Sequence, residues 1–168
     1  MTKKAMTTDD RPTWDETWLG VAALVAKRSR CSRAQMGAVI VSSDQHIVAT
    51  GYNGPAANWP EQGQCINWCE RAQGVTSLGT EYTGCPAIHA EANALLYVDR
   101  SKSLGGTMYI VSPPCDACAK LISNSGITRV VCMISEADMH RDPYKVLEYL
   151  KRCGVEVVVV KDRSDDGN

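Results

Sequence analysis

The 168-residue chain has no strong excess of charge of either sign and no long apolar run. Its formal net charge of −1 gives no general attraction to nucleic acid or to anionic membranes. No apolar run approaches the roughly 18 residues that a membrane-spanning helix needs, and residues 1–12 are polar, without the apolar core of a signal peptide. We therefore expect a cytoplasmic protein with neither a membrane nor a nucleic acid as its partner.

The size and composition of the chain are those of one globular domain. Its apolar share of 44% and its charged share of 22% are typical of soluble proteins. We expect disorder in residues 1–12 and in the polar tail 162–168, with a single domain over residues 13–161.

Hydrophobic periodicity predicts helices alternating with strands. The predicted helices are Thr13–Arg30, Glu91–Val98, Cys115–Ser125 and Pro143–Arg152, and the predicted strands are Met36–Val41, His46–Thr50, Thr107–Val111, Arg129–Met133 and Val155–Val160. The first two strands form a hairpin, and the last three run parallel through right-handed crossovers. This order predicts an α/β fold with one mixed five-stranded sheet covered by helices on both faces.

Two short motifs supply the residues of a zinc site. His89-Ala90-Glu91 and Pro114-Cys115-Asp116-Ala117-Cys118 offer one imidazole and two thiolates as ligands, with the Glu91 carboxylate to spare. Three protein ligands leave a fourth zinc position for water, which is typical of catalytic sites, and a neighbouring carboxylate can move the protons of that water. This H-x-E and P-C-x-x-C pattern is the signature of zinc-dependent nucleobase deaminases.

The predicted helices explain how these side chains would converge. Cys115 and Cys118 are three positions apart and share one face at a helix N-terminus, where the helix dipole favours thiolate. His89 begins a separate helix, and Glu91 lies on another face of it, free to approach the water. A structural zinc knuckle and a redox-active C-x-x-C pair are the alternatives for the two cysteines, but the redox reading gives no role to His89 or Glu91.

A wider set of segments narrows the family. They are Cys31-Ser32-Arg33, Gly37-Ala38-Val39-Ile40-Val41, Gly51-Tyr52-Asn53-Gly54-Pro55, His89-Ala90-Glu91-Ala92-Asn93-Ala94-Leu95 and Pro114-Cys115 with Cys118-Ala119-Lys120-Leu121-Ile122. In these segments the chain resembles the deoxycytidylate (dCMP) deaminases of the cytidine deaminase superfamily. The resemblance implies a three-layer cytidine-deaminase-like fold and zinc-dependent hydrolysis of dCMP to dUMP and ammonia, which supplies dUMP for thymidylate synthesis.

The resemblance also suggests the residues that bind the nucleotide. Asn53 would hold a sugar hydroxyl, although an asparagine that only satisfies a turn is the alternative. Arg33 is the candidate for the 5′-phosphate, because its planar guanidinium matches phosphate oxygens. The remaining candidates are Ala90, Ser112 and Tyr144, the last closing the site together with Arg141 unless it packs in the core.

Four further cysteines precede the catalytic motif, three of them in the irregular stretch of residues 51–85. Cys31, Cys65, Cys69 and Cys85 would complete one tetrahedral structural zinc site, as some members of the family have in this region. A ligand set that includes His46 or His140, and free thiols, are the alternatives. The other two cysteines, Cys132 and Cys153, are expected to be small buried hydrophobic residues.

Other functions share part of this pattern. A deaminase of dCTP or deoxycytidine would use the same zinc chemistry, and so would a deaminase of tRNA or single-stranded DNA, which needs a basic groove. A zinc-stabilised binding module would not need Glu91. The family resemblance further implies a homo-oligomer, a hexamer or a dimer, with dCTP and dTTP as effectors. Arg100 is a candidate interface or regulatory residue, and a polar helix end explains it equally well.

Overall fold

The computed structural model describes residues 11–74 and 84–161. The disorder expected for residues 1–12 and 162–168 lies outside the described residues, except for Arg11 and Pro12, which precede the first helix. In the described part of the chain, no helix has the length and apolarity that crossing a bilayer requires.

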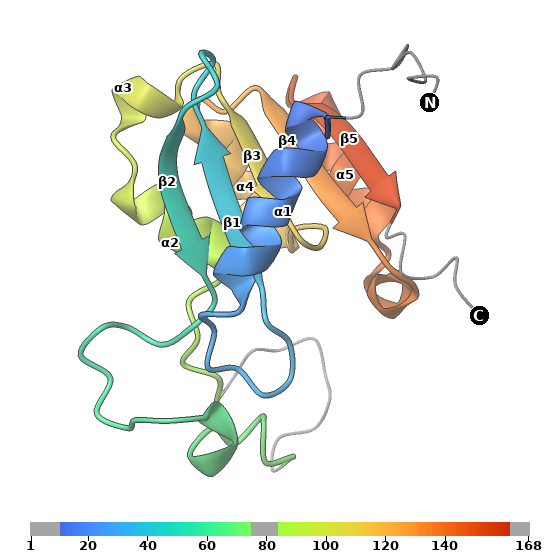
Figure 1. Cartoon of the computed structure of the whole chain (residues 1–168). Helices are drawn as coiled ribbons and strands as arrows, with labels where there is room; N and C mark the ends of the chain where they lie inside the picture. The colour runs from blue at the N-terminus through green and yellow to red at the C-terminus, as the bar shows by residue number, and fades with distance from the viewer. Residues whose placement is uncertain (1–10, 75–83, 162–168) are drawn as a thin grey trace, which may run out of the picture.

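One mixed sheet of five strands forms the centre of the molecule (Figure 1). Its order is β2 (Ile47–Tyr52), β1 (Gly37–Val41), β3 (Thr107–Ile110), β4 (Arg129–Ile134) and β5 (Glu156–Lys161). Strand β1 pairs antiparallel with β2 and β3, whereas β3, β4 and β5 are parallel. The predicted mixed five-stranded sheet, its hairpin and its three parallel strands are confirmed.

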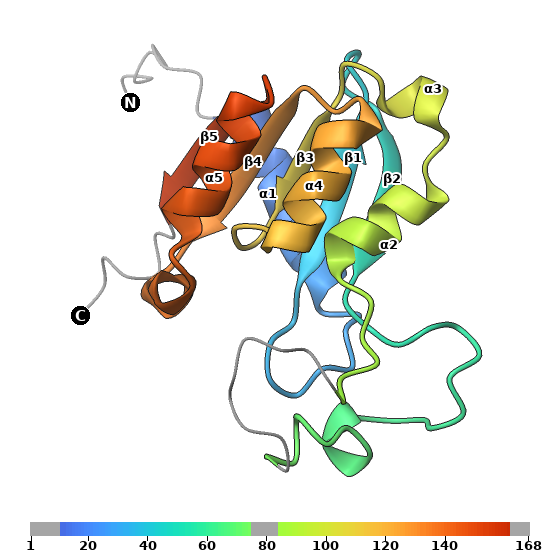
Figure 2. The same ribbon diagram turned by 180° about the vertical axis from the view of Figure 1, so that it is seen from behind.

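Helices cover both faces of this sheet, as expected. Helix α1 (Trp14–Ala26) lies on one face, and α2 (Ala90–Tyr97), α4 (Asp116–Ser125) and α5 (Pro143–Arg152) lie on the other (Figures 1 and 2). The short helix α3 (Arg100–Ser103), which periodicity did not predict, follows α2.

The first helix begins where the sequence indicates and ends earlier. The Thr13 side chain accepts a hydrogen bond from the Glu16 backbone N–H, and the Glu16 carboxylate accepts one in return from the backbone of Thr13. This capping box makes Thr13 the N-cap of the helix. The helix ends at Ala26 rather than Arg30, because the chain turns so that the hydroxyl of buried Ser29 donates to the carbonyl oxygen of Asn53 at 2.8 Å.

The strand β1 is buried along its whole length, with alternate side chains in two separate cores. Ala38 and Ile40 face α2 and α4, whereas Val39 and Val41 pack with Leu19 of α1. This period of two is the pattern of a strand covered on both faces.

The long connection from β2 to α2 begins and ends at the same place. Gly54 and Ile88 form an isolated β-bridge, with N···O distances of 3.1 and 2.8 Å. The described part of this connection includes a single 3₁₀ turn, η1 (Cys65–Asn67). Figure 1 shows this connection at the end of the sheet where α2 begins, so the connection borders the segment that carries His89.

The burial of the two remaining cysteines differs from the expectation in one case. Cys132 on β4 is fully buried, as predicted. Cys153 is exposed, so the prediction of a buried residue was wrong. It caps the end of α5, where the chain turns through Gly154 toward β5 and leaves the core.

Candidate active site

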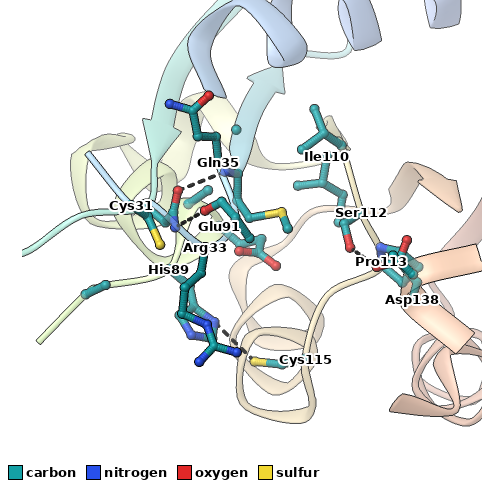
Figure 3. Close-up of a pocket in the computed structure, with 18 of the residues that line it drawn as sticks. Cys31, Arg33, Gln35, His89, Glu91, Ile110, Ser112, Pro113, Cys115 and Asp138 are labelled. Atoms are coloured by element: carbon teal, nitrogen blue, oxygen red, sulfur yellow. Dashed lines mark hydrogen bonds between the residues drawn. The ribbon is translucent and has the colours of Figure 1, made fainter. Parts of the chain in front are cut away.

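Two helix N-termini bring the imidazole and the two thiols together. His89 caps α2 and Cys115 caps α4, both with extended backbone, at φ −69°, ψ 154° and φ −77°, ψ 168°. Nδ1 of His89 lies 3.4 Å from Sγ of Cys115 and 3.5 Å from Sγ of Cys118 (Figure 3 shows the first contact). The convergence predicted from the two motifs is confirmed.

The spacing of these three atoms fits a zinc ion. With Zn–N and Zn–S bonds of about 2.0 and 2.3 Å at tetrahedral angles, nitrogen and sulfur ligands stand about 3.5 Å apart. All three atoms lie within 4.8 Å of one another. His89, Cys115 and Cys118 can therefore hold one tetrahedral ion and leave its fourth position to solvent or substrate.

The electrostatics of the three side chains also suit a cation. Hydrogen bonds from the Cys118 thiol and the His89 ring lower the pKa of Cys115 to about 3, against the opposing effect of burial, and the Cys118 backbone N–H acts in the same direction. The same contact with Cys115, together with burial, raises the pKa of Cys118. The Cys115 thiolate raises the pKa of His89, and burial and the charge of Arg141 oppose it. A bound cation would displace the remaining protons from these ligands.

Glu91 lies in the first turn of α2 and does not share the His89 face. Its side chain is only 8% exposed, and burial raises the pKa of its carboxyl group. The Cys118 thiol and the charge of His89 act in the opposite direction and do not outweigh burial. A carboxyl group with a raised pKa next to a metal site can both accept and donate protons near neutral pH.

The metal centre opens into a cavity of about 590 Å³. This is within the range of sites for small organic ligands. His89, Glu91 and Cys115 form part of its wall, together with polar residues from three other segments. The polar residues that the argument uses below are Arg33, Asn53, Ser112, Asp138 and Arg141.

Comparison with known proteins agrees with this geometry. Residues 12–134, more than half of the chain, match the family model described as the cytidine and deoxycytidylate deaminase zinc-binding region. The chain belongs to this family. It is 47% identical over 122 residues to a deoxycytidylate deaminase of Mycobacterium phage D29, covering 72% of this chain and 94% of that protein. It is also 37% identical over 126 residues to a human deoxycytidylate deaminase, covering 74% of this chain and 67% of the human protein.

A solved structure of the same family has the same fold. The dCMP deaminase from the cyanophage S-TIM5, crystallised in complex with dCMP and dUMP, superposes with a TM-score of 0.67 at 27% sequence identity. The superposition covers 90% of this chain and all of that one. The cytidine-deaminase-like fold that the sequence implied is therefore confirmed.

Four of the five candidate nucleotide-binding residues line the cavity, namely Arg33, Asn53, Ala90 and Ser112. Tyr144 does not. Its side chain is 57% exposed at the start of α5, and Arg141, in the segment before that helix, lines the cavity instead. The two are separated by Pro143, which starts α5 and leaves Tyr144 on its solvent side.

Asn53 and Arg33 already have partners in the protein. The Asn53 amide accepts from the Met36 backbone N–H at 2.8 Å and donates to the Ala34 carbonyl oxygen at 2.9 Å. Asn53 therefore fixes the loop before β1 and still lines the cavity. Arg33 donates from Nη1 to the carbonyl oxygen of Arg71 at 3.0 Å, which joins that loop to the segment after η1.

The four upstream cysteines line the same cavity. Among the described residues, however, the only trio of candidate ligand atoms within 4.8 Å of one another is that of the catalytic centre. The His46 ring bonds to the carbonyl oxygen of Asp44 in the β1–β2 turn. Cys31 precedes the start of β1 and His46 follows its end, so the structure does not support a ligand set that includes His46.

Sequence reasoning missed Asp138 in the 3₁₀ segment η2 (Glu136–Arg141). It is 6% exposed and lines the cavity. The signal that could have indicated it is Ser135-Glu136-Ala137-Asp138, a capping-box pattern that the structure realises in both directions. Its partners across the cavity wall could not be read from that pattern.

Proposed function

We propose that this protein hydrolyses dCMP to dUMP and ammonia, with one zinc ion held by His89, Cys115 and Cys118. The observation that carries the proposal is the arrangement of these ligands beside the buried Glu91 carboxyl group. The dCMP specificity is supported by the identity of 47% to the phage D29 deoxycytidylate deaminase and by the likeness to the cyanophage enzyme that binds dCMP and dUMP.

Glu91 is the proton carrier in this mechanism. When bound, the zinc ion would lower the pKa of a water molecule and hold it for attack on C4 of the cytosine ring. Glu91 accepts one proton from the attacking water and delivers it to N3, which makes C4 more electrophilic. It then carries the second proton to the amino group, which leaves as ammonia when the C4–N bond breaks. Because burial raises the pKa of Glu91, the carboxyl group can serve in both directions.

The nucleotide lies between the metal centre and the loop before β1 in this proposal. Asn53 hydrogen-bonds a sugar hydroxyl, using the donor and acceptor capacity that its two backbone contacts leave free. Arg33 binds the 5′-phosphate at the cavity rim. Ala90 and Ser112 border the base near Glu91.

A second, structural zinc ion on Cys31, Cys65, Cys69 and Cys85 is part of the proposal. All four cysteines line one cavity. Burial raises the pKa of Cys85, and the neighbouring thiols of Cys69 and Cys31 add to that effect. Sγ of Cys65 also accepts a hydrogen bond from the Ser32 backbone N–H at 3.2 Å, a contact typical of metal-bound thiolates. A metal ion would draw the thiols together and fix the loops that carry Arg33.

Assembly, regulation and location complete the proposal. We expect a homo-oligomer, a hexamer or a dimer, and the exposed side chains of Leu96, Tyr97 and Leu121 around α2 and α4 provide an apolar surface for it. We expect dCTP and dTTP as effectors. Arg100 donates to the carbonyl oxygen of Asn124 at 3.1 Å, which favours its reading as a helix end. All eight cysteines, each within the described residues, are free thiols, consistent with the reducing cytoplasm.

The experiment that tests this function compares turnover of dCMP, deoxycytidine, cytidine, dCTP and a cytosine-containing oligonucleotide. We expect the highest kcat/KM for dCMP. A higher kcat/KM for any other compound would show that this compound, and not dCMP, is the preferred substrate. Sigmoidal dCMP kinetics that dCTP sharpens and dTTP suppresses would support the regulatory part, and hyperbolic kinetics that neither nucleotide changes would reject it.

A further inference from the structure

A buried carboxylate lies in the cavity wall opposite the loop of Arg33 and outside the proposed chemistry. Asp138 is 6% exposed and lies beyond residue 134, where the match to the family model ends. Its Oδ2 accepts hydrogen bonds from the Ser135 backbone N–H at 3.0 Å and from the Ser135 hydroxyl at 2.8 Å. Its Oδ1 accepts from the Ser112 hydroxyl at 2.6 Å, as Figure 3 shows, and from Nη2 of Arg141.

These bonds connect two loops of the active site. Ser112 follows β3 and lies three residues before the zinc ligand Cys115, whereas Arg141 ends η2. Nη2 of Arg141 also donates to the Ser112 hydroxyl at 2.9 Å. The three side chains thus form a closed triangle in which the Ser112 hydroxyl both donates and accepts, so this hydroxyl holds the arrangement while the residue also lines the cavity.

The Asp138 carboxylate is ionised at neutral pH. Burial acts to raise its pKa, but hydrogen bonds from Ser112, Ser135 and Arg141 outweigh it and hold the pKa below its usual value. The ionised Asp138 carboxylate therefore holds the Arg141 guanidinium in place, because the hydrogen bonds that the carboxylate accepts fix its own orientation.

Arg141 keeps donors available toward the cavity. Within the described residues, its bonds to the protein come from Nη2 alone, which leaves the three N–H donors of Nε and Nη1. Its side chain is 34% exposed and lines the same cavity as His89 and Glu91. An arginine that is anchored at one nitrogen and open at the others is suited to a phosphate oxygen.

We infer that Arg141 binds the 5′-phosphate of the nucleotide and that Asp138 is a positioning residue that holds Arg141 for this contact. The inference rests on the proposed function and deepens it. Arg33 and Asp138 lie on either side of Glu91 in Figure 3, so the phosphate would be bound from two walls of the cavity. The arginine on the Asp138 side is the better fixed of the two, because within the described residues Arg33 is anchored only by the carbonyl oxygen of Arg71.

The test separates phosphate recognition from chemistry. Steady-state kinetics with dCMP and deoxycytidine are measured for wild type, Arg141→Ala, Asp138→Asn and the double variant. Calorimetric binding of dUMP and deoxyuridine is measured in parallel. Arg152→Ala, an exposed arginine of α5 outside the cavity, is the matched control. Zinc content and thermal unfolding establish that each variant is folded and contains zinc.

For Arg141→Ala we expect KM for dCMP and Kd for dUMP to rise about 10- to 100-fold, the effect of one lost charge-assisted hydrogen bond. The deoxycytidine and deoxyuridine values should change less than about threefold. Asp138→Asn should raise the same two constants, KM for dCMP and Kd for dUMP, by a smaller factor and keep kcat unchanged. The double variant should bind dCMP and dUMP no more weakly than Arg141→Ala does.

Equal losses for nucleotide and nucleoside in Arg141→Ala, or an unchanged KM and Kd, would overturn the inference. Additive losses in the double variant would show that Asp138 does not act through Arg141. If wild type does not deaminate dCMP, the proposed function fails, and the comparison of dUMP with deoxyuridine binding still decides whether Arg141 recognises phosphate.

Discussion

His89 and Glu91 stand two positions apart in the sequence and need opposite environments. His89 must present a ring nitrogen to a cation, and it does so from the helix N-cap beside two thiols. In the proposed mechanism Glu91 exchanges protons, and its burial at 8% exposure raises its pKa in the direction that this task needs. The first turn of α2 separates the two side chains, so that in the proposed mechanism His89 would bind the metal and Glu91 would act on its water.

The replacement Glu91→Gln tests this division of labour. The amide has the shape of the carboxyl group but cannot carry protons, so we expect dCMP turnover to fall by a factor of about 10²–10⁴ or more. Zinc content should stay unchanged, because Glu91 is not among the three ligands. Glu148→Gln, a change on the exposed side of α5, should leave both quantities unaltered. Near-normal turnover in Glu91→Gln would remove this residue from the mechanism.

At the scale of elements, one carboxylate ties α1 to the sheet. Asp15 accepts two hydrogen bonds from Arg129 of β4, both at 2.7 Å, and one from the Tyr109 hydroxyl of β3 at 3.0 Å. The hydrogen bonds from Arg129 lower the pKa of Asp15, while burial and the bond to Asp15 raise the pKa of Tyr109 to about 12. The three residues are far apart in sequence, and their contact fixes the position of the helix.

We expect Asp15→Asn to lower the free energy of unfolding by about 1–3 kcal/mol at pH 7. Because the folded-state pKa of Asp15 lies below its unfolded value of about 3.9, the contribution is complete above that value. It is lost as the pH falls through the folded pKa. Urea unfolding of wild type and Asp15→Asn across this pH range should therefore show a difference in the free energy of unfolding that disappears in acid. A stability difference that stays constant with pH would mean that the ion pair between Asp15 and Arg129 does not cause it.

Gly51 lets α2 approach β2. A Cβ atom at this position would lie 2.2 Å from the carbonyl oxygen of Ala90 and 2.5 Å from the backbone nitrogen of Ala94. Gly51→Ala must therefore push away the helix that carries His89 and Glu91. We expect a stability loss of about 1–3 kcal/mol and weaker zinc retention during dialysis against a chelator.

Gly20→Ala is the matched control for this change. Its added methyl group meets nothing within 4 Å on the surface of α1, so stability should rise slightly, by about 0.5–1 kcal/mol, with zinc retention unchanged. Unaltered zinc retention in Gly51→Ala would show that α2 can shift without disturbing the metal centre.

Sequence patterns predicted the elements that have a clear period and the residues whose chemistry has a fixed spacing. The strand β1 and the helix α5 follow from periodicity, and the ligand set follows from the two motifs at helix starts. Periodicity could not indicate the 3₁₀ segment η2, which is too short to show one. It also could not show that Asp138 is buried, because its burial depends on Ser112 from the loop after β3 and on Arg141 at the end of η2.

Local sequence patterns also could not show the surroundings of Asn53 and Cys153, because these depend on the tertiary structure. The sequence left Asn53 between a ligand role and a turn role, and its two backbone bonds show that it stabilises a loop while lining the cavity. Cys153 follows an amphipathic helix, but whether the residue after a helix is covered depends on the direction in which the chain leaves.

At the scale of the whole molecule, the proposed structural zinc would hold the irregular connection against the sheet. We expect two zinc ions per chain in purified wild type and one in Cys69→Ser, because Cys69 is a proposed ligand of the structural ion alone. Cys153→Ser, an exposed cysteine outside both sites, should retain two. Elemental analysis of the three proteins checks this, and one zinc ion in wild type would reject the second site.

The central claim is that a zinc ion on His89, Cys115 and Cys118 makes this chain a dCMP deaminase. The most direct measurement is dCMP deamination by the same protein as purified, after removal of metal by a chelator, and after return of zinc. We predict activity that vanishes with the metal and returns with one zinc ion per catalytic site. Undiminished deamination by protein from which elemental analysis finds the zinc removed would contradict the account.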